Sequence, residues 1–405
     1  MRPILLSAAL LAGLLLMACG PDEQDTRSSK MPVEPIEPIK SPAQIEEALA
    51  FTCTYEKDRI PPRDPEADML FEHANWRSKK NRMKEDKAVY FEVERLYRIA
   101  TAWGHDKAAN NLFNMILRGQ SSGVDRETKP AEIARDLTER GIPHGYYLTG
   151  FLLKKGLGVQ FDYDAGEQYS RKAADLGDPD AQYSIGKKLT ALTLKKHPVP
   201  YKIGKEMKRC AADQGHAQAA IDTANGYQIN AEYSSQPEEK ANFYADALKY
   251  FQIAVKSGDS SAALGLGEAF NDPAPDDRMN YLGQAKDEER VARYKAIWKI
   301  LEGYDYLPAK ADEIDEICPL PPAKLPPWDG KLQWVEKWEN NEAPPLPSEE
   351  RIGEMALLKN LNPETGLPVK IDFAGSRLFD PQTGKPLTIK GETVKMIRRL
   401  RNSME

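Results

Sequence analysis

The chain has 405 residues and carries 56 Lys and Arg against 62 Asp and Glu, which gives a formal net charge of −6 at pH 7. This near balance excludes the strongly basic surface that is typical of nucleic-acid-binding proteins. Mild acidity is compatible with a partner that has a basic site, but a charge of −6 over this length hardly discriminates between kinds of partner.

The first 18 residues are predicted to be a signal peptide and not part of the fold. Arg2 supplies a positive charge, and residues 4–17 form an apolar run shorter than the ~20 residues that a membrane-spanning helix needs. Residues 16–19, Leu-Met-Ala-Cys, resemble a bacterial lipobox. The resemblance implies cleavage before Cys19 and lipidation of Cys19, which would anchor the protein to a membrane.

An ordinary secretory signal that ends by coincidence at a cysteine is the alternative. Gly20 follows Cys19, and the lack of an Asp there favours the outer membrane under the enterobacterial sorting rule. We therefore expect a periplasmic protein, lipid-anchored to the outer membrane. Residues 19–44 are polar and rich in proline, which predicts an extended tether.

Residues 45–103 are predicted to be an N-terminal helical segment. The proline-rich stretch 60–65 interrupts it, and Asp64 before Pro65 is typical of a helix start. Residues 90–102 and 107–117 should form a first helix pair around Gly104.

Residues 162–186 show the clearest local pattern of helix, stop and second helix. Apolar or small residues recur at spacings of four, four and three between Ala165 and Leu176, which places them on one helical face. Gly177 can end that helix in a left-handed conformation, and Asp178 can cap the next one.

This pattern recurs along the chain. The helix-ending glycines are Gly104, Gly141, Gly177, Gly215 and Gly258, separated by 37, 36, 38 and 43 residues on subtraction. A small residue follows each glycine four places later: Ala108, Gly145, Ala181, Ala219 and Ala262. A period near 40 residues with this content predicts an α-solenoid. Chance periodicity in an alanine-rich helical protein is the alternative. It is disfavoured because the glycine and the small residue four places later recur together in all five copies.

The repeated stretch resembles the SEL-like repeat, a short relative of the tetratricopeptide repeat. The best match runs from Gly156 to Gly186, a second copy surrounds Gly215, and residues 134–150 form a weaker copy. The resemblance covers about residues 96–303 and implies an all-α fold, with SEL-like helix-pair repeats over 104–303. The inserts at 231–240 and 271–278 are expected to be polar loops.

The composition changes after the repeats. Residues 304–347 are predicted to be a Pro-rich, aromatic linker, because their prolines forbid a long helix. Residues 348–405 are predicted to be a small C-terminal cap, with a helix over 348–358 and two Pro-x-x-Gly turns flanking short apolar runs. A solenoid needs such a piece to cover its last hydrophobic face.

Three cysteines remain once Cys19 is lipidated. Cys53 and Cys318 flank the repeats, whereas Cys210 occupies a helix position within them, where a free or buried thiol is expected. The segments 50–53, 61–70, 96–99, 318–334 and 347–368 resemble an uncharacterised domain that accompanies SEL-like repeats in Gram-negative lipoproteins. That resemblance implies a disulfide between Cys53 and Cys318.

Patterns typical of an active site are missing from the sequence. The chain has no His-x-x-x-His, no Cys-x-x-Cys and no Gly-x-Ser-x-Gly, so we expect no zinc site, no cofactor and no catalytic residues. His105 and His216 each follow a repeat glycine, and His144 lies three residues beyond one, which indicates turn residues and not metal ligands. A hydrolase is therefore disfavoured.

The expected function is protein binding by the curved surface of the solenoid. Lipoproteins with these repeats and this domain resemble immunity proteins against type VI secreted antibacterial phospholipases of the phospholipase D class. The resemblance implies that the chain binds such an effector in the periplasm and inhibits it. A scaffold or regulator of other periplasmic proteins is the alternative.

Candidate partner contacts are acidic residues at helix starts and tyrosines on inter-helix loops. They are Asp162, Tyr163, Asp164, Asp178, Asp180 and Tyr233. Helix capping is the competing interpretation of the carboxylates, and many exposed tyrosines have no role.

Overall fold

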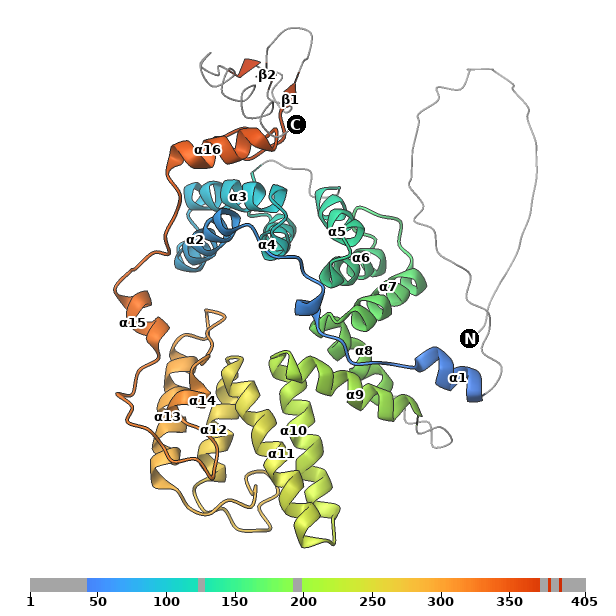
Figure 1. Ribbon diagram of the computed structural model, residues 1–405, viewed down its shortest axis with the longest axis vertical. Helices are drawn as coiled ribbons and strands as arrows, with labels where there is room; N and C mark the ends of the chain where they lie inside the picture. Colours follow the sequence, from blue (N-terminus) through green and yellow to red (C-terminus); the bar gives the residue numbers. More distant parts are fainter. Residues whose placement is uncertain (1–41, 123–127, 192–198, 372–377, 380–385, 388–405) are drawn as a thin grey trace, which may run out of the picture. The chain divides into compact units, whose positions relative to one another are not determined.

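The computed structural model describes residues 42–122, 128–191, 199–371, 378–379 and 386–387 (Figure 1). Contacts divide the chain into the units Met1–Pro38 and Ile39–Glu405, and every described residue belongs to the second. The predicted lipidation site Cys19, the signal peptide and most of the tether lie outside the described residues. Within the described part, no helix combines the length and apolar character needed to cross a membrane.

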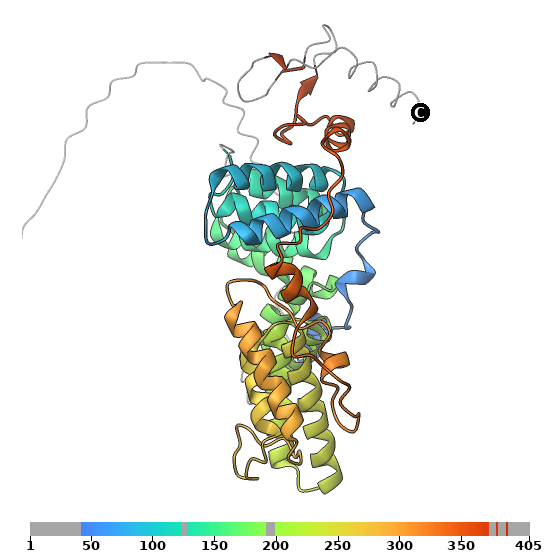
Figure 2. The ribbon, with the colours of Figure 1, turned by 90° about the vertical axis from the view of Figure 1, so that its left-hand side faces the viewer.

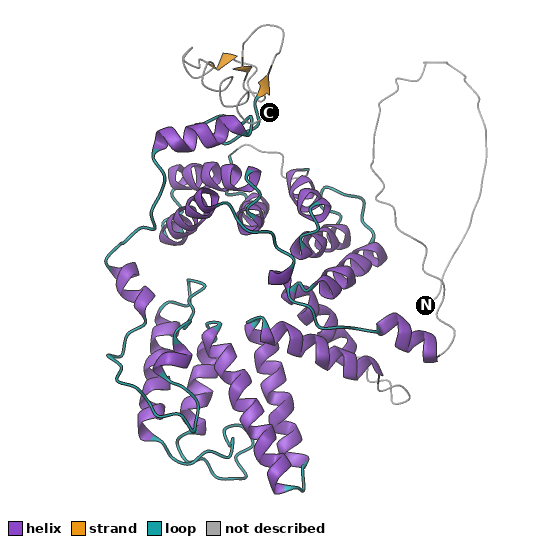
Figure 3. Ribbon diagram, in the orientation of Figure 1, coloured by secondary structure: helices purple, strands orange, loops and turns teal. Residues whose placement is uncertain are grey.

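Helices make up most of the described chain, which confirms the predicted all-α class (Figure 3). The helices are α1 (Pro42–Leu49), α2 (Pro65–Asn81), α3 (Lys87–Ala102), α4 (Asp106–Leu117), α5 (Lys129–Glu139), α6 (Pro143–Lys155), α7 (Tyr163–Leu176), α8 (Pro179–Ala191), α9 (Val199–Asp213), α10 (Ala217–Tyr233), α11 (Pro237–Lys256), α12 (Ser260–Ala269), α13 (Glu288–Gly303), α14 (Ile314–Ile317), α15 (Gln333–Glu339) and α16 (Glu349–Leu358), with a 3-10 helix η1 at Glu56–Asp58. Three short strands, β1 (Lys370–Ile371), β2 (Leu378–Phe379) and β3 (Pro386–Leu387), form an antiparallel sheet in that order.

The five predicted helix-ending glycines all have left-handed backbone angles, which glycine adopts without a Cβ clash. Their φ values are +87° at Gly104, +73° at Gly141, +109° at Gly177, +85° at Gly215 and +98° at Gly258. The small residue four places later is buried in every case: Ala108, Gly145, Ala181, Ala219 and Ala262. The predicted solenoid of helix pairs is therefore confirmed.

Neighbouring helices approach backbone to backbone where glycines face each other. A Cβ added at Gly150 of α6 would lie 2.7 Å from the carbonyl oxygen of Gly166 in α7. A Cβ at Gly186 of α8 would lie 2.8 Å from the carbonyl oxygen of Gly204 in α9. Small residues thus set the spacing between successive pairs, because bulk here would force the helices apart.

Residues 50–64, here called the N-terminal strap, run across the turns of several helix pairs (blue, between α1 and α2 in Figure 1). Thr54 donates a 2.9 Å hydrogen bond to the carbonyl of Asp175, and Gln182 donates one of 2.9 Å to the carbonyl of Thr54. The N–H of Glu56 donates to the side-chain oxygen of Gln214 at 2.8 Å. The last two bonds satisfy strap backbone groups with side chains of α8 and of the turn after α9, whereas the first satisfies a carbonyl of α7.

The strap packs closely against the turn between α7 and α8. A Cβ on Gly177 would lie 2.7 Å from the backbone nitrogen of Glu56. At its far end the strap is held by Arg63, whose guanidinium makes two hydrogen bonds, of 2.6 and 3.0 Å, to the carboxylate of Asp106 in α4. Such bidentate pairs fix geometry as well as charge.

A disulfide fixes the strap to α9, and it is not the predicted one. Cys53 is bonded to Cys210, with their Cα atoms 5.7 Å apart, so the predicted Cys53–Cys318 pairing is wrong. Cys318 is a free, fully buried thiol in the core next to α11 and α13, and Gln252 donates a 3.0 Å hydrogen bond to its carbonyl. Burial raises the pKa of this thiol to about 11. Cys318 is thus held in the core of the last repeats, whereas the strap passes over α9.

The last helix pair is covered by residues 304–347 and not by the predicted C-terminal cap. Buried Arg290 of α13 donates a 3.0 Å hydrogen bond to the carbonyl of Pro319, and buried Arg293 donates to the carbonyl of Ile317. The N–H of Ala311 donates to the carbonyl of Lys256 at 3.1 Å. The buried arginines supply donors to carbonyls of a chain whose prolines have no N–H group.

Helix α16 packs instead on the first helix pair, as Figures 1 and 2 show. Ile352, Met355 and Ala356 are fully buried in one cluster with residues of α2, α3 and α4. Arg351 pairs with Glu66 of α2 at 2.6 Å, and the indole of Trp103 donates to the carbonyl of Met355 at 3.1 Å. The apolar face of α16 therefore covers the first hydrophobic face of the solenoid, since the last is already occupied.

One predicted loop is mostly helical. Within 231–240 only residues 234–236 lie between α10 and α11. Pro237 opens α11 and two glutamates follow in its first turn, which favours an earlier helix start than we expected. The insert at 271–278 is a loop, as predicted.

The disulfide is expected to contribute strongly to stability, because it closes a chain segment of 157 residues. Replacing Cys53 by Ser should lower the free energy of unfolding by about 3–5 kcal/mol. A reductant should lower the melting temperature of the wild type but not of Cys53→Ser. Peptide mapping under non-reducing conditions should join the Cys53 and Cys210 peptides; a peptide joined through Cys318 would contradict the pairing.

Two glycine substitutions separate backbone strain from contact with the strap. Gly177→Ala and Gly141→Ala both place a side chain at positive φ, but a Cβ at Gly141 meets no atom within 4 Å. We expect Gly177→Ala to be more destabilising than Gly141→Ala by about 1–3 kcal/mol, because the strap must move. Chemical denaturation of the two variants measures the difference, and equal midpoints would mean that the strap does not rest on this turn.

Candidate functional site

Polar caps line the edge where the second helix of a pair begins, at α4, α8, α10 and α12, whereas Ile142 at the start of α6 provides no side-chain cap. His105 and His216 each accept a hydrogen bond on Nδ1 from the N–H three residues later, at 3.0 and 3.1 Å. Asp178 and Asp259 cap α8 and α12 in the same way. The interpretation of His105 and His216 as turn residues is confirmed, since the ring nitrogen replaces the usual cap oxygen.

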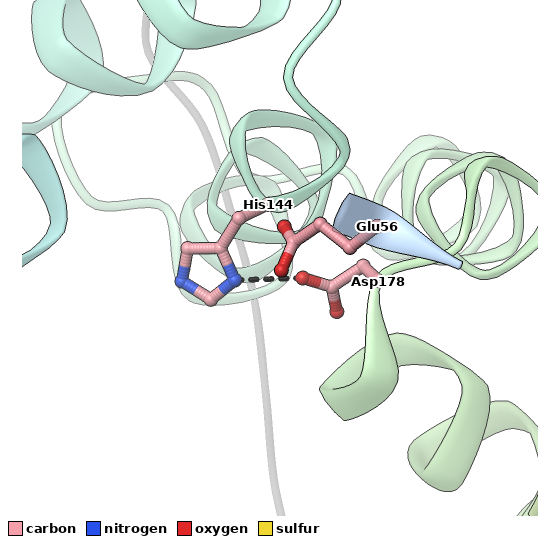
Figure 4. A group of neighbouring side chains, drawn as sticks. All are labelled: Glu56, His144 and Asp178. Carbon is pink, nitrogen blue, oxygen red and sulfur yellow. Dashed lines mark hydrogen bonds and ion pairs between the residues drawn. The ribbon is translucent and has the colours of Figure 1, made fainter. Parts of the chain in front are cut away.

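A cluster of three ionisable side chains joins the strap to this edge (Figure 4). Glu56 lies in η1 of the strap, His144 in the first turn of α6, and Asp178 caps α8. Nδ1 of His144 is 2.7 Å from Oδ2 of Asp178, and one ligand-type atom of each residue lies within 4.8 Å of the others. The cluster thus links segments that are remote in sequence.

The electrostatics of the cluster follow from burial and charge. Burial lowers the pKa of His144, but the hydrogen bond and charge of Asp178 outweigh it and raise that pKa to about 9. Burial raises the pKa of Glu56 to about 7, and the negative charge of Asp178 acts in the same direction. The arrangement offers a place for a proton or another cation, and the three side chains include no Ser, Cys or Lys nucleophile.

The predicted partner contacts differ in how far they are exposed. Asp162, Tyr163 and Asp164 are exposed at the start of α7, where Asp162 also caps the helix. Tyr233 is 82% exposed and is the last residue of α10. Both tyrosines lie at helix ends and not on loops, and all four residues remain candidate contacts.

Asp178 cannot be a direct partner contact. Its side chain is fully buried and accepts from the N–H of Ala181 while it faces His144. Helix capping, the competing interpretation, therefore describes this residue. Asp180 is half exposed, and its carboxylate lies 3.4 Å from Nε2 of His216, which lowers the pKa of Asp180.

A groove that the sequence analysis did not identify lies on the faces of α9 and α10. It encloses a cavity of about 600 Å³. Tyr201, Lys205 and Arg209 of α9 line it at spacings of four, together with Tyr227 and Ile229 of α10. Tyr201 and Ile229 are 48% and 52% exposed.

A second cavity, of about 350 Å³, continues this surface toward α12. Asn225 of α10 lines both cavities, so the two form one surface, here called the α9–α12 groove. Leu264 and Met279 line the second cavity and are also exposed. The groove therefore presents four large apolar side chains to solvent, which is typical of a protein-binding surface.

The charge on the larger cavity of the groove is mainly positive, whereas the smaller cavity is lined by one charged residue, Glu268. The larger cavity is lined by four basic residues (Lys202, Lys205, Lys208, Arg209) and two acidic ones (Glu206, Asp222). Asp222 already pairs with Lys208 at 3.3 Å. Among the described residues, the buried hydroxyl of Thr223 in the same cavity has no hydrogen-bond partner. The groove thus favours an acidic and apolar partner surface.

The sequence held only a weak signal for this groove. Tyr201, Lys205 and Arg209 follow a helical spacing, but so do the core residues Ile203, Met207 and Cys210 of the same helix. Only packing decides which face of α9 meets neighbouring helices and which stays open.

One protein-family model matches part of the chain. Residues 262–369 match the family described as a domain of unknown function, DUF6396. This range contains Cys318 and the segment 347–368, which the sequence analysis assigned to an uncharacterised domain, but not the segments at 50–53 and 61–70. A comparison with curated proteins found no match.

Several solved structures are similar to this chain. The Pseudomonas aeruginosa protein PA5086 is 29% identical with a TM-score of 0.48, and the immunity protein Pa5087 of the same organism is 26% identical with a TM-score of 0.46. Each alignment covers 67% of this chain and 95% of the other. A Sel1 repeat protein from Oxalobacter formigenes is 21% identical with a TM-score of 0.39, over 55% of this chain and 86% of that one. The chain is thus similar to both groups that its sequence resembles, SEL-like repeat proteins and immunity proteins.

Proposed function

We propose that this chain is a periplasmic, lipid-anchored immunity protein that binds and inhibits a type VI secreted phospholipase of the phospholipase D class. The α9–α12 groove is the observation that carries the proposal, because it is an open, partly apolar surface on the face of a solenoid. The class of partner comes from the sequence resemblance to immunity lipoproteins.

The groove has the chemistry of a protein-binding site. Exposed aromatic and aliphatic side chains such as Tyr201 and Ile229 can enter pockets of a partner, and such anchors supply most of the affinity of an interface. Lys202, Lys205 and Arg209 at the same surface can accelerate encounter with an acidic partner and set its orientation.

The positive charge of these three residues changes how we expect the chain to inhibit the phospholipase. The acidic residues chosen from the sequence would suit contact with the basic phosphate-binding site of the enzyme. The positive groove instead favours an acidic surface of the enzyme, so binding would occlude the active site by steric cover. Asp162 and Asp164, at the start of α7, can then contact basic residues at the border of the interface.

Binding alone suffices for this function. Immunity requires that the complex form before the effector reaches phospholipid, and attachment to the outer membrane through Cys19 would place the inhibitor there. No cofactor and no catalytic step by this chain is needed.

The decisive experiment is co-expression with a type VI secreted phospholipase of the phospholipase D class, directed to the periplasm. Growth should be restored, and the two proteins should elute as a one-to-one complex. Failure of rescue despite correct export, with no complex on size exclusion, would exclude immunity and leave the scaffold alternative.

Two matched substitutions locate the interface. Tyr201→Ala in the groove should weaken binding to the phospholipase at least tenfold, which corresponds to about 1.4 kcal/mol. Phe91→Ala is the control, because Phe91 is 53% exposed against 48% for Tyr201 and also lies near a helix start, but in α3 outside the groove. Titration calorimetry measures both; an equal effect of the two substitutions would place the partner elsewhere.

The anchor is tested separately. Cys19→Ala should release the protein from membranes into the soluble periplasmic fraction, because lipidation requires the thiol and the sequence of the proline-rich tether contains no long apolar run. Fractionation at high salt measures this. Continued recovery of the variant with membranes would show that the anchor lies elsewhere.

A further inference from the structure

Glu56, His144 and Asp178 converge from three elements that are remote in sequence (Figure 4). Glu56 belongs to the N-terminal strap, His144 to α6, and Asp178 to the cap of α8. Such convergence of one imidazole and two carboxylates is not explained by capping, since only Asp178 caps a helix among the three.

Hydrogen bonds on the far side of His144 fix the orientation of its ring. The side-chain amide of Asn114 donates to the backbone carbonyl of Asn110 at 3.0 Å and to Oδ1 of Asn110 at 3.1 Å. Oδ1 of Asn110 is therefore an acceptor, and it lies 3.2 Å from Nε2 of His144. Nε2 thus carries a hydrogen and donates it, which turns Nδ1 toward the two carboxylates.

Nδ1 can bind either a second proton of the imidazole ring or a metal ion. The net charge of the cluster differs between these two states. With a proton, the three side chains carry a net charge of −1. Asp106 and Asp180 add further negative charge near the cluster. In the described part of the chain, no Lys or Arg forms a salt bridge with Glu56 or Asp178. With a divalent cation on a neutral imidazole, the net charge of the three side chains and the ion would be zero.

We propose that Glu56, His144 and Asp178 bind a zinc-class divalent cation through Nδ1 of His144 and one oxygen of each carboxylate, with a fourth position for water. One imidazole with two carboxylates is a ligand set that Zn²⁺ accepts, whereas Mg²⁺ and Ca²⁺ prefer oxygen ligands alone. The other oxygen of Asp178 stays on the N–H of Ala181.

The geometry requires the three ligand atoms, which lie within 4.8 Å of one another, to move to the spacing of a metal site. Ligand atoms around tetrahedral zinc lie about 3.3 Å apart, given bonds of roughly 2.0–2.1 Å. Nδ1 of His144 and Oδ2 of Asp178, now 2.7 Å apart, must therefore separate by about 0.6 Å. The cation would then join the strap to α6 and α8, next to Gly177 and in addition to the disulfide at Cys53.

The test uses the purified full chain with its disulfide intact, stripped of metal with a chelator and titrated with Zn²⁺ or Mg²⁺. We expect one equivalent of Zn²⁺ to bind and to raise the melting temperature, and Mg²⁺ at the same concentration to have no effect. Binding of Mg²⁺ as tight as that of Zn²⁺, or no binding of Zn²⁺ at 100-fold molar excess, would overturn the proposal.

Glu56→Gln is the diagnostic variant because it removes a ligand charge and keeps nearly the same shape. Zn²⁺ affinity should fall at least tenfold, as it does when metal-site groups are lost. Glu238→Gln, the same change at an exposed position of α11, is the control and should bind like the wild type. An unchanged Zn²⁺ affinity in Glu56→Gln would show that the ion binds adventitiously elsewhere, and would overturn the proposed site.

A measurement on the wild type alone keeps the proposal testable if Glu56→Gln does not fold. X-ray absorption at the zinc edge should give a shell of nitrogen and oxygen neighbours without sulfur. A sulfur neighbour would place the ion at a cysteine, and so exclude this cluster.

Discussion

The attachment of the N-terminal strap to the turns of the repeats is the constraint on which the rest of the structure depends. A solenoid is held together mainly by contacts between neighbouring helix pairs, so its pairs can shift relative to one another. Here Cys53, Glu56 and Arg63 tie the strap to α9, to the turn between α9 and α10, and to α4, respectively. One segment thus couples several pairs, and bonds of long sequence separation limit their relative motion.

The strap and the proposed binding groove meet different faces of α9. Cys210 lies on the buried face with Ile203 and Met207, whereas Tyr201 and Lys205 lie on the open face. A helix fixed on one side by a covalent bond presents rigid side chains on the other. This preorganisation benefits a binding surface, because little conformational entropy is lost when the partner docks.

Both ends of the solenoid are covered by the C-terminal part of the chain. Residues 304–347 cover α13 through buried arginines, and α16 covers the first pair through Ile352 and Met355. The apolar faces that a repeat array leaves at its two ends are thus both buried without a separate N-terminal cap.

The sequence by itself determined the helix pairs, their glycine stops and the histidine and aspartate turns, because these depend on residues within four or five positions of one another. Tertiary structure alone decided that Cys53 bonds Cys210, that α16 covers the first pair, and that Glu56 meets His144 and Asp178. These contacts join residues about 30 to 290 positions apart, so no local spacing encodes them. The sequence could not predict which face of α9 stays open for the same reason. Residues on both faces follow a helical spacing, and only packing against other helices buries one of them.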